Sequence, residues 1–421
     1  MSGGDGTPIS PVDSGGGLSQ QAQQAYQANM AIRNAWIRGA APLIQAVATA
    51  SPTYAAGQAT TVNLLGSATG LIKKFYLVVS GTINATSGTW TPTPLGITNL
   101  FSNMTFTDLN TRVRHNTTGA HMHMIQAARR GWVPGMALLS TAISDPTGWG
   151  ANFFTNSQPA SVVGGTPQNF EWVWEIPISY TDTDLRGAIW ANQVTANNLL
   201  SLTINPAFFG SNAVASDLSA SAYNSVTALG TGLPTLTNLK FTLYQDMFVQ
   251  GPTDKNGQIM LPQVDMAYSY NVLMVPAQAL QANSDNVFFA PPNRQILSHM
   301  LFWDNYLYNT LPAGSDITSI KIQIANSLVV RQMEPGILGY WTRNLLGTDM
   351  PVGSSGGVGT TKKDFTTYYI DTRRRPLNVQ TSGNVGLYFN PNNVQGGANL
   401  NIGYEYLEIQ SATFNAPGFG L

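Results

Sequence analysis

The sequence contains no cysteine among its 421 residues. This absence excludes disulfide bonds, thiolate nucleophiles and zinc sites with cysteine ligands. The N-terminal segment is rich in Gly, Ser and Pro and lacks an apolar stretch, and no run of about 18 apolar residues occurs anywhere in the chain. We therefore expect neither a signal peptide nor a membrane-spanning helix.

Charged side chains are also scarce. They make up 10% of the chain, whereas about 25% is usual for soluble domains. Lys and Arg number 20 and Asp and Glu number 21, so the net charge is −1, which disfavours nucleic-acid binding driven by overall charge. The hydrophobic fraction of 43% is ample for a core, and 35 Asn and 41 Gly accompany it. Because interfaces between proteins are depleted in Lys, Glu and Asp, this composition favours a subunit of an assembly.

One long helix is predicted, over residues 18–38, after a flexible tail at 1–17. The stretch contains neither Gly nor Pro and is rich in Ala and Gln. Its apolar residues recur at helical spacing and would form one face: Leu18, Ala22, Tyr26, Met30 and Ile37. A glycine and then a proline follow and end the helix.

From Thr53 onward the sequence is typical of β-structure. The clearest strand is 170–180, in which large apolar residues occupy every second position. Further strands are predicted at 75–79, 199–204, 239–244, 317–324, 385–389 and 400–409. Short helices are predicted at 118–130 and 182–193. Strands separated by long connections favour sandwiches or jelly rolls over a parallel βαβ sheet.

Two pairs of predicted strands resemble each other. The first strand of each pair ends in Asn-Pro, and the second opens with Asn-Leu. These motifs lie at 205–206 and 238–239 in one pair and at 390–391 and 399–400 in the other. Two β domains that end with the same succession of strands would produce this echo.

Three of the four histidines, His115, His121 and His123, lie close together in the sequence. On a strand, His121 and His123 would share one face, and with Asp108 nearby they would be a usable metal pair. No Glu or Cys completes such a site, and a helix would point the two imidazoles apart. A structural role is therefore the favoured interpretation.

The other candidate chemical groups also have simpler explanations. Residues 353–357 match the G-x-S-x-G nucleophile motif but lack the strand–turn–helix context and the later His that it needs. Asp182 and Asp184 follow a strand, where Asp commonly caps a turn. The basic runs at 362–363 and 373–375 would suit phosphate, but isolated basic runs are usually solvated or paired at interfaces. The sequence thus predicts no enzyme, no cofactor and no required metal.

Several stretches in a common order point to a known family. They are YTDTDLRGA at 180–188, NGQIMLP at 256–262, GNVGLYFNP at 383–391, GYEY at 403–406 and GAHMH at 119–123. None is chemically specific, but together they span most of the chain. In this order they resemble the major capsid protein of tectiviruses, the tailless icosahedral phages with a membrane inside the shell.

The resemblance implies an all-β double jelly roll, which is two eight-stranded sandwiches in one chain, with an N-terminal helical arm. We expect residues 1–50 to form the flexible tail and the arm, 51–248 the first jelly roll and 249–421 the second, joined near 246–257. The resemblance also implies a homotrimeric capsomer of pseudo-hexagonal outline. Such capsomers, with penton and minor capsid proteins, would build an icosahedral shell around an internal membrane and a double-stranded DNA genome.

The sequence departs from this family in its longer Gly/Ser-rich N-terminus and in extra loop length at 211–234 and 347–361. The alternative function is another β-rich virion protein, such as a spike or receptor-binding protein, but no fibre-like repeats occur. A carbohydrate-active enzyme would need clustered carboxylates, which the sequence also lacks. We expect a virion protein that is assembled in the host bacterial cytoplasm and has no direct sequence-specific contact with nucleic acid.

The predicted arm is the candidate membrane contact. No acidic residue occurs between Asp13 and Asp108, whereas basic residues do. Arg33 and Arg38 share the predicted helix with Trp36, and a helix with arginines and aromatic residues can lie on an anionic bilayer. We therefore expect Arg33, Trp36 and Arg38 to face the viral membrane. Packing under the jelly rolls or against a neighbouring capsomer is the alternative.

Overall fold

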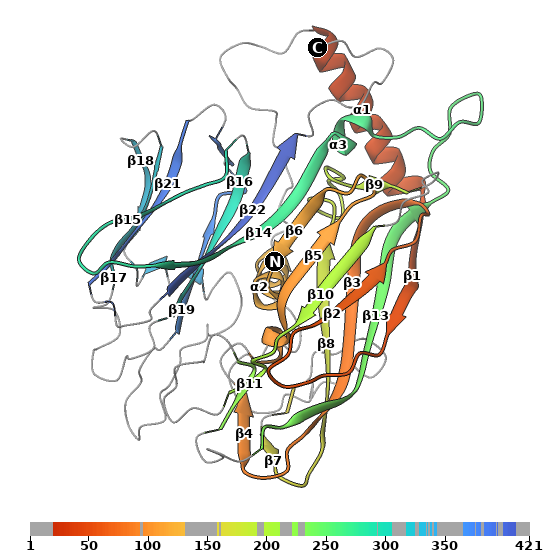
Figure 1. The fold of residues 1–421 in the computed structure, drawn as a ribbon. Coiled ribbons are helices and arrows are strands. Elements are labelled where there is room, and N and C mark those ends of the chain that lie inside the picture. The colour runs from red at the N-terminus through yellow and green to blue at the C-terminus, as the bar shows by residue number, and fades with distance from the viewer. Residues whose placement is uncertain are drawn as a thin grey trace.

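Two β-sandwiches lie side by side in the protein (Figure 1). The structure is a computed structural model. It describes residues 20–92, 96–130, 158–159, 161–191, 198–210, 221–225, 232–292, 294–304, 317–324, 328–333, 335, 337–338, 341–342, 365–374, 376–379, 383–392, 394 and 399–409.

The first sandwich has two facing sheets of four long strands. One sheet has the order β1 (Ala41–Ala50), β13 (Thr235–Val249), β3 (Leu71–Asn84) and β8 (Gln168–Pro177), with β9 (Ile189–Trp190) also paired to β3. The facing strands have the order β2 (Thr60–Leu65), β10 (Leu199–Ile204), β5 (Phe101–Thr107) and β6 (Val113–Thr117). A small sheet at one end contains β11 (Phe209–Gly210), β12 (Tyr223–Asn224), β4 (Thr89–Pro92) and β7 (Val162–Val163), and the 3-10 helix η1 (Gly96–Leu100) precedes β5.

The second sandwich repeats this strand order. One set of strands is β14 (Tyr268–Ala279), β22 (Asn399–Ile409), β16 (Gln295–Asp304) and β19 (Phe365–Asp371), with β20 (Leu377–Asn378) paired to β16. The facing sheet is β15 (Asn286–Phe289), β21 (Val385–Pro391), β17 (Ile317–Ile324) and β18 (Leu328–Met333). In each sandwich the last strand lies beside the first, which is the arrangement of a jelly roll. The fold is thus a double jelly roll.

The predicted echo marks equivalent strands of the two jelly rolls. Asn-Pro directly follows β10 and ends β21, and each of these strands is second in its sheet, beside β2 and β15. The strands that begin at or contain Asn-Leu are β13 and β22, and each lies between the first strand of its jelly roll and a third strand. The prediction that both halves end with the same succession of strands is confirmed.

A single nine-stranded sheet crosses from one jelly roll to the other. Its order is β19-β16-β22-β14-β6-β5-β10-β2, with β20 attached. The crossing point is a parallel pairing between β14 and β6, where Val272 lies opposite His115 and Leu273 opposite Asn116. The two sandwiches therefore share backbone hydrogen bonds as well as side-chain contacts.

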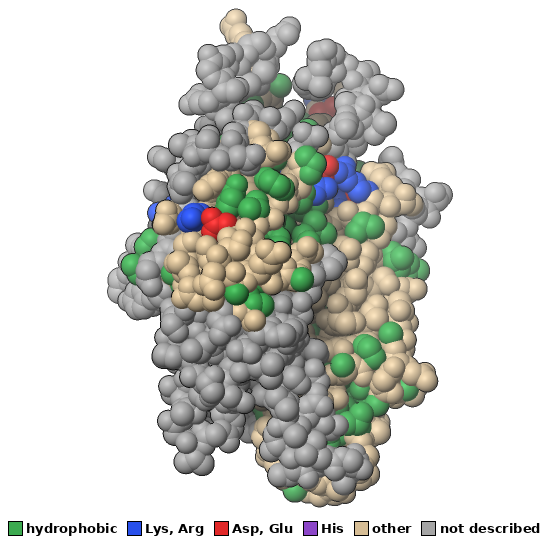
Figure 2. All heavy atoms as spheres, turned by 60° about the vertical axis from the view of Figure 1, so that its left-hand side comes forward, with side chains coloured by type: hydrophobic (Ala, Val, Ile, Leu, Met, Phe, Trp, Pro, Cys, Tyr) green, Lys and Arg blue, Asp and Glu red, His purple; other side chains and the backbone are tan. Residues whose placement is uncertain are grey.

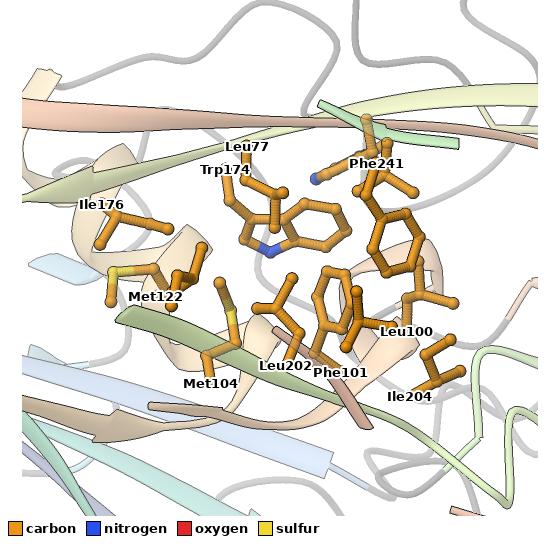
Figure 3. Packing of buried hydrophobic residues seen from close by; sticks show 14 of the residues in the cluster. Leu77, Leu100, Phe101, Met104, Met122, Trp174, Ile176, Leu202, Ile204 and Phe241 are labelled. Carbon is orange, nitrogen blue, oxygen red and sulfur yellow. The ribbon is translucent and has the colours of Figure 1, made fainter. Parts of the chain in front are cut away.

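Each jelly roll has its own hydrophobic core. The alternation predicted along 170–180 places Trp172, Trp174 and Ile176 in the first core. Figure 3 shows the aromatic centre of this core, where the Phe101 ring lies 4.9 Å from Trp174 and 5.5 Å from Phe241 at steep angles. Edge-to-face contacts of this kind add to the stabilisation that burial of apolar area already provides.

Two of the three predicted helices are present in the structure. The structure contains α1 (Gln20–Gly39) and α2 (Gly119–Arg130), as predicted. The predicted helix at 182–193 is wrong, since bends and β9 occupy the described part of this segment. Gly187 has a φ of +94°, and a Cβ there would lie 2.6 Å from the carbonyl oxygen of Ile178. This left-handed residue ends any helix that begins near Asp182.

The first jelly roll begins earlier than predicted. The predicted arm extends to residue 50, but residues 41–50 form β1 and pair with β13. Their many alanines and a proline gave no alternating pattern. The connection between the jelly rolls runs over residues 250–267 and includes the short helix α3 (Gln263–Met266).

Candidate functional site

Helix α1 is fixed to the body of the protein by Trp36. This side chain is fully buried, and its Nε1 donates a hydrogen bond to the carbonyl oxygen of Met260 at 2.7 Å. Its ring packs against Trp190 and Phe248, with centroids 5.9 and 6.3 Å away. A Cβ at residue 251 would overlap the indole, so Gly251 makes room for it. The arm is therefore packed onto both the first jelly roll and the connection.

A buried ionic triad fixes the same helix. The Arg33 guanidinium lies 3.2 Å from Asp184, in the loop after β8, and 3.0 Å from Asp265 in α3. Arg186 also binds Asp184, at 2.7 Å. Burial raises the pKa of Asp265 to about 6, although Arg33 acts against this rise. Removing Arg33 would leave two carboxylates without their shared cation, which is costly in a buried site.

The prediction that Arg33 and Trp36 face the membrane is wrong. Both side chains are buried against the protein, with 5% and 0% of their surface exposed. The physical reason is that acids from distant parts of the sequence neutralise the basic segment. Lys73 likewise pairs with Asp246, 3.0 Å away. Arg38, by contrast, is exposed and forms no ion pair with any described residue.

Helix α2 lies between the two jelly rolls (Figure 1) and is buried along most of its length. The ring of His121 packs against Phe302 of the second jelly roll, and that of His123 against Trp172 of the first. The helix thus points these two histidines toward different jelly rolls, and the strand-based metal pair does not form. A Cβ on Gly403 of β22 would overlap the His121 ring, so helix and sheet touch closely.

His115 joins the jelly rolls at the crossing point of the sheet. One ring nitrogen lies 2.7 Å from the carbonyl oxygen of Pro177, and the other accepts a hydrogen bond from the amide of Val272 at 3.1 Å. Burial lowers the pKa of His115, and likewise of His121 and His123, to about 3. These histidines are neutral in the folded protein at ordinary pH, which agrees with the structural role favoured from the sequence.

A buried ionic contact between the jelly rolls was not predicted. The fully buried Glu405 of β22 binds Arg129 of α2 at 3.1 Å. Its other carboxylate oxygen accepts hydrogen bonds from Ser298 at 3.0 Å and Tyr369 at 3.4 Å. The Arg129 guanidinium also lies over the Tyr270 ring, 4.3 Å from its centroid. Sequence spacing gave no sign of this contact because 276 residues separate the two charges.

Those of the remaining predicted groups that the structure describes do not converge on a reaction centre. Asp182 binds Lys74 at 2.6 Å, whereas Asp184 belongs to the Arg33 triad. The turn between them is capped by the hydroxyl of Thr181, which accepts a hydrogen bond from the amide of Asp184 at 2.9 Å. Asp108 binds Arg114 at 2.8 Å. The capping role favoured for this turn is shared by Thr181 and by Asp184, whose Oδ1 accepts a hydrogen bond from the amide of Arg186 at 3.2 Å.

Several predictions lie outside the described residues. They concern the tail at 1–17, the motif at 353–357, the basic run at 362–363, Arg375 and most of the two long loops. Over the described ranges, no three His, Cys, Asp or Glu side chains form a group that would hold a metal. The helices within the same ranges also lack the length and apolar character needed to cross a bilayer.

Uncharged strand edges are exposed on both jelly rolls. Strand β1 carries no charged residue and leaves Leu43 and Ile44 exposed, and Leu65 of the neighbouring β2 is exposed as well. On the second jelly roll, the edge strand β15 exposes Val287 and Phe289. Among the residues that Figure 2 colours, charged side chains form only small spots on this face. Isolated proteins usually protect such edges with charges, so these edges are suited to contacts with other chains.

The repeated strand order and the shared sheet define a protein of the double jelly-roll class. Two family models match the chain: "P3 major capsid protein N-terminal" over residues 17–250 and "P3 major capsid protein C-terminal" over residues 267–419. The chain belongs to this P3 major capsid protein family.

Individual relatives agree with the family assignment. Major capsid protein P3 of Enterobacteria phage PRD1 is 27% identical over 398 residues, which is 94% of each chain. The crystal structure of the STIV MCP has a TM-score of 0.57 at 12% identity and covers 89% of this chain and 99% of its own. The atomic structure of Sulfolobus Turreted Icosahedral Virus has a TM-score of 0.55 at 12% identity, with 87% and 91% covered. The protein is a major capsid protein of a phage similar to PRD1 and a component of the virion; its family is structural rather than enzymatic.

Proposed function

We propose that three copies of this chain form a capsomer of pseudo-hexagonal outline. The observation that supports this is the pair of jelly rolls with the same strand order, because three such chains present six similar units around one axis. A closed threefold ring needs two different, complementary surfaces on each chain. The exposed edge of β1 and β2 on the first jelly roll and that of β15 on the second are candidates for these surfaces.

These capsomers, together with penton and minor capsid proteins, would build an icosahedral shell around an internal membrane and a double-stranded DNA genome. Assembly would take place in the host bacterial cytoplasm. The protein would act without catalysis and without direct sequence-specific binding of nucleic acid. The boundary between the jelly rolls is assigned to the connection at 250–267.

The solution mass tests the trimer. Light scattering of the full chain should give three times 45.1 kDa at micromolar concentration. Since the proposed surfaces carry apolar and uncharged side chains, the trimer mass should be the same at low and high salt. Ile44→Lys places a charge on the exposed edge of β1 and should shift the equilibrium toward the monomer. A wild-type monomer under these conditions would disprove the proposal.

We propose a limited membrane contact through Arg38. The exposed face of α1 carries mainly Gln, Ala and Asn, so it offers little apolar surface to a bilayer. Each basic residue near an anionic surface contributes about 1 kcal/mol. One Arg38 per chain is therefore a weak contact, and only repetition across a shell would make it effective.

Flotation with anionic vesicles at low salt tests this contact. The Arg38→Gln trimer should float less than the wild type, whereas the control Arg374→Gln, an exposed charge on the second jelly roll, should float equally well. Equal flotation of wild type and Arg38→Gln would leave α1 as an internal clamp or a contact between capsomers.

A further inference from the structure

One pocket is lined by charged side chains from both jelly rolls. It has a volume of about 160 Å³. Its charged lining residues are Lys73, Lys74, Arg129, Glu175, Asp182 and Arg373. Four bases and two acids line the pocket, and three further acids that pair with these bases lie outside its lining: Asp246, Glu405 and Asp371. The wall of the pocket itself therefore presents more charged donors than acceptors, which suits an anionic ligand.

The two acids of the pocket are both engaged by one lysine. The Lys74 ammonium lies 2.6 Å from Asp182 and 3.4 Å from Glu175. Lys73 has its acid partner, Asp246, outside the lining of the pocket. The lining acids therefore pair with Lys74, whereas the acid partner of Lys73 does not line the pocket.

The two arginines also have their acid partners behind the pocket. Arg129 binds Glu405 at 3.1 Å and Arg373 binds Asp371 at 2.9 Å, and neither acid lines the pocket. The guanidinium of Arg373 donates to the carbonyl oxygen of Ala128 at 3.4 Å, which brings it beside Arg129. Two like charges, one from each jelly roll, are thus held together at the wall of the pocket.

Arg129 has an unused donor as well. Its Nε is buried and has no hydrogen-bond partner within the described part of the chain. A buried donor that lacks a partner costs stability, and an anion or a water molecule would supply one. Guanidinium groups bind tetrahedral phosphate oxygens through paired hydrogen bonds, and a shared anion would also reduce their mutual repulsion.

We propose that this pocket binds a phosphate group that bridges Arg129 of the first jelly roll and Arg373 of the second. The group would come either from free phosphate or from a phospholipid headgroup. Asp182 lies two residues from Asp184, which holds Arg33 of α1, so the pocket is at the end of the molecule that carries the arm. This position is compatible with a phospholipid headgroup as the source of the phosphate. The experiments below distinguish a headgroup from free phosphate.

Calorimetric titration of the full-length trimer with inorganic phosphate tests the site, at constant ionic strength in a chloride buffer. Arg373→Gln removes one charge-assisted contact and should weaken phosphate binding about tenfold. Arg374→Gln removes the same charge from the next, exposed residue and should bind phosphate as the wild type does. Unchanged melting temperatures would verify that both variants fold. No binding by the wild type, or equal binding by the wild type and Arg373→Gln, overturns the proposal.

Flotation with phosphatidylglycerol vesicles then identifies the source of the phosphate. Loss of flotation in Arg373→Gln but not in Arg374→Gln would assign the pocket to a lipid headgroup. Flotation unchanged in a variant that has lost phosphate binding would assign it to free phosphate. Arg38→Gln should keep phosphate binding, which makes this result independent of the membrane contact proposed for α1.

Discussion

Acid should destabilise the protein because three buried histidines must remain neutral for the jelly rolls to stay together. Burial lowers the pKa of His115, His121 and His123 from 6.5 to about 3. Their neutral forms contribute stability that is complete above pH 6.5, and this contribution is lost as the pH falls from 6.5 toward 3. At pH 5 each histidine is mostly protonated in the unfolded chain but neutral in the folded protein. This difference lowers the free energy of unfolding by about 2 kcal/mol per histidine.

The three histidines together cost about 6 kcal/mol at pH 5. Asp265 has the opposite effect, because its pKa is raised from 3.8 to about 6 by burial and the folded protein takes up this proton first. Its protonation raises the free energy of unfolding by about 1 kcal/mol at pH 5 relative to pH 8. The net loss of about 5 kcal/mol is as large as the whole stability of many domains.

Urea unfolding at pH 8 and pH 5 measures this loss, at one protein concentration because association also stabilises the chain. The midpoint should fall sharply at pH 5. In His123→Gln the difference in unfolding free energy between the two pH values should shrink by about two fifths, even if the variant is less stable at both. Equal midpoints for the wild type at pH 8 and pH 5 would refute the assignment of neutral buried histidines.

Three substitutions test the packing of the arm and of the junction. Trp36→Ala empties a buried site and should weaken docking of α1 by about 3–5 kcal/mol, seen as faster proteolysis within residues 20–39 while the jelly rolls stay folded. Gly403→Ala forces a Cβ against His121 and should lower stability by about 1–3 kcal/mol, measured by thermal melting. Glu405→Gln leaves Arg129 buried without its counter-charge and should cost about 3–5 kcal/mol; a melting temperature equal to the wild type's would contradict this.

The sequence predicts strands well where one face of a sheet is buried. Strands β10 and β17 have the predicted bounds, and β8 follows the predicted alternation with only its last residues in a turn. It fails for β1, whose residues 41–46 are exposed on both faces. Such a strand is held by backbone pairing to β13 rather than by burial of one face. Its sequence therefore lacks the alternation of apolar and polar residues from which a strand is predicted.

The arm shows why a helix can be predicted while its face is not. The apolar spacing indicated a face with Tyr26 and Met30, but the most buried side chains are Asn29, Arg33 and Trp36. Arg33 is buried because Asp184 and Asp265, far away in the sequence, meet it in the fold. A polar residue that is buried by long-range pairing has no signature in local periodicity.

The nine-stranded sheet fixes how the two halves of the chain can move. A hinge between the jelly rolls would have to break the β6–β14 pairing and disturb His115, α2 and the Glu405 contact together. Over the described residues, the two jelly rolls of each chain are therefore expected to move as one rigid body. A curved shell built from such rigid chains acquires its curvature at the interfaces between chains. Interface residues, rather than core residues, therefore determine the curvature of the shell.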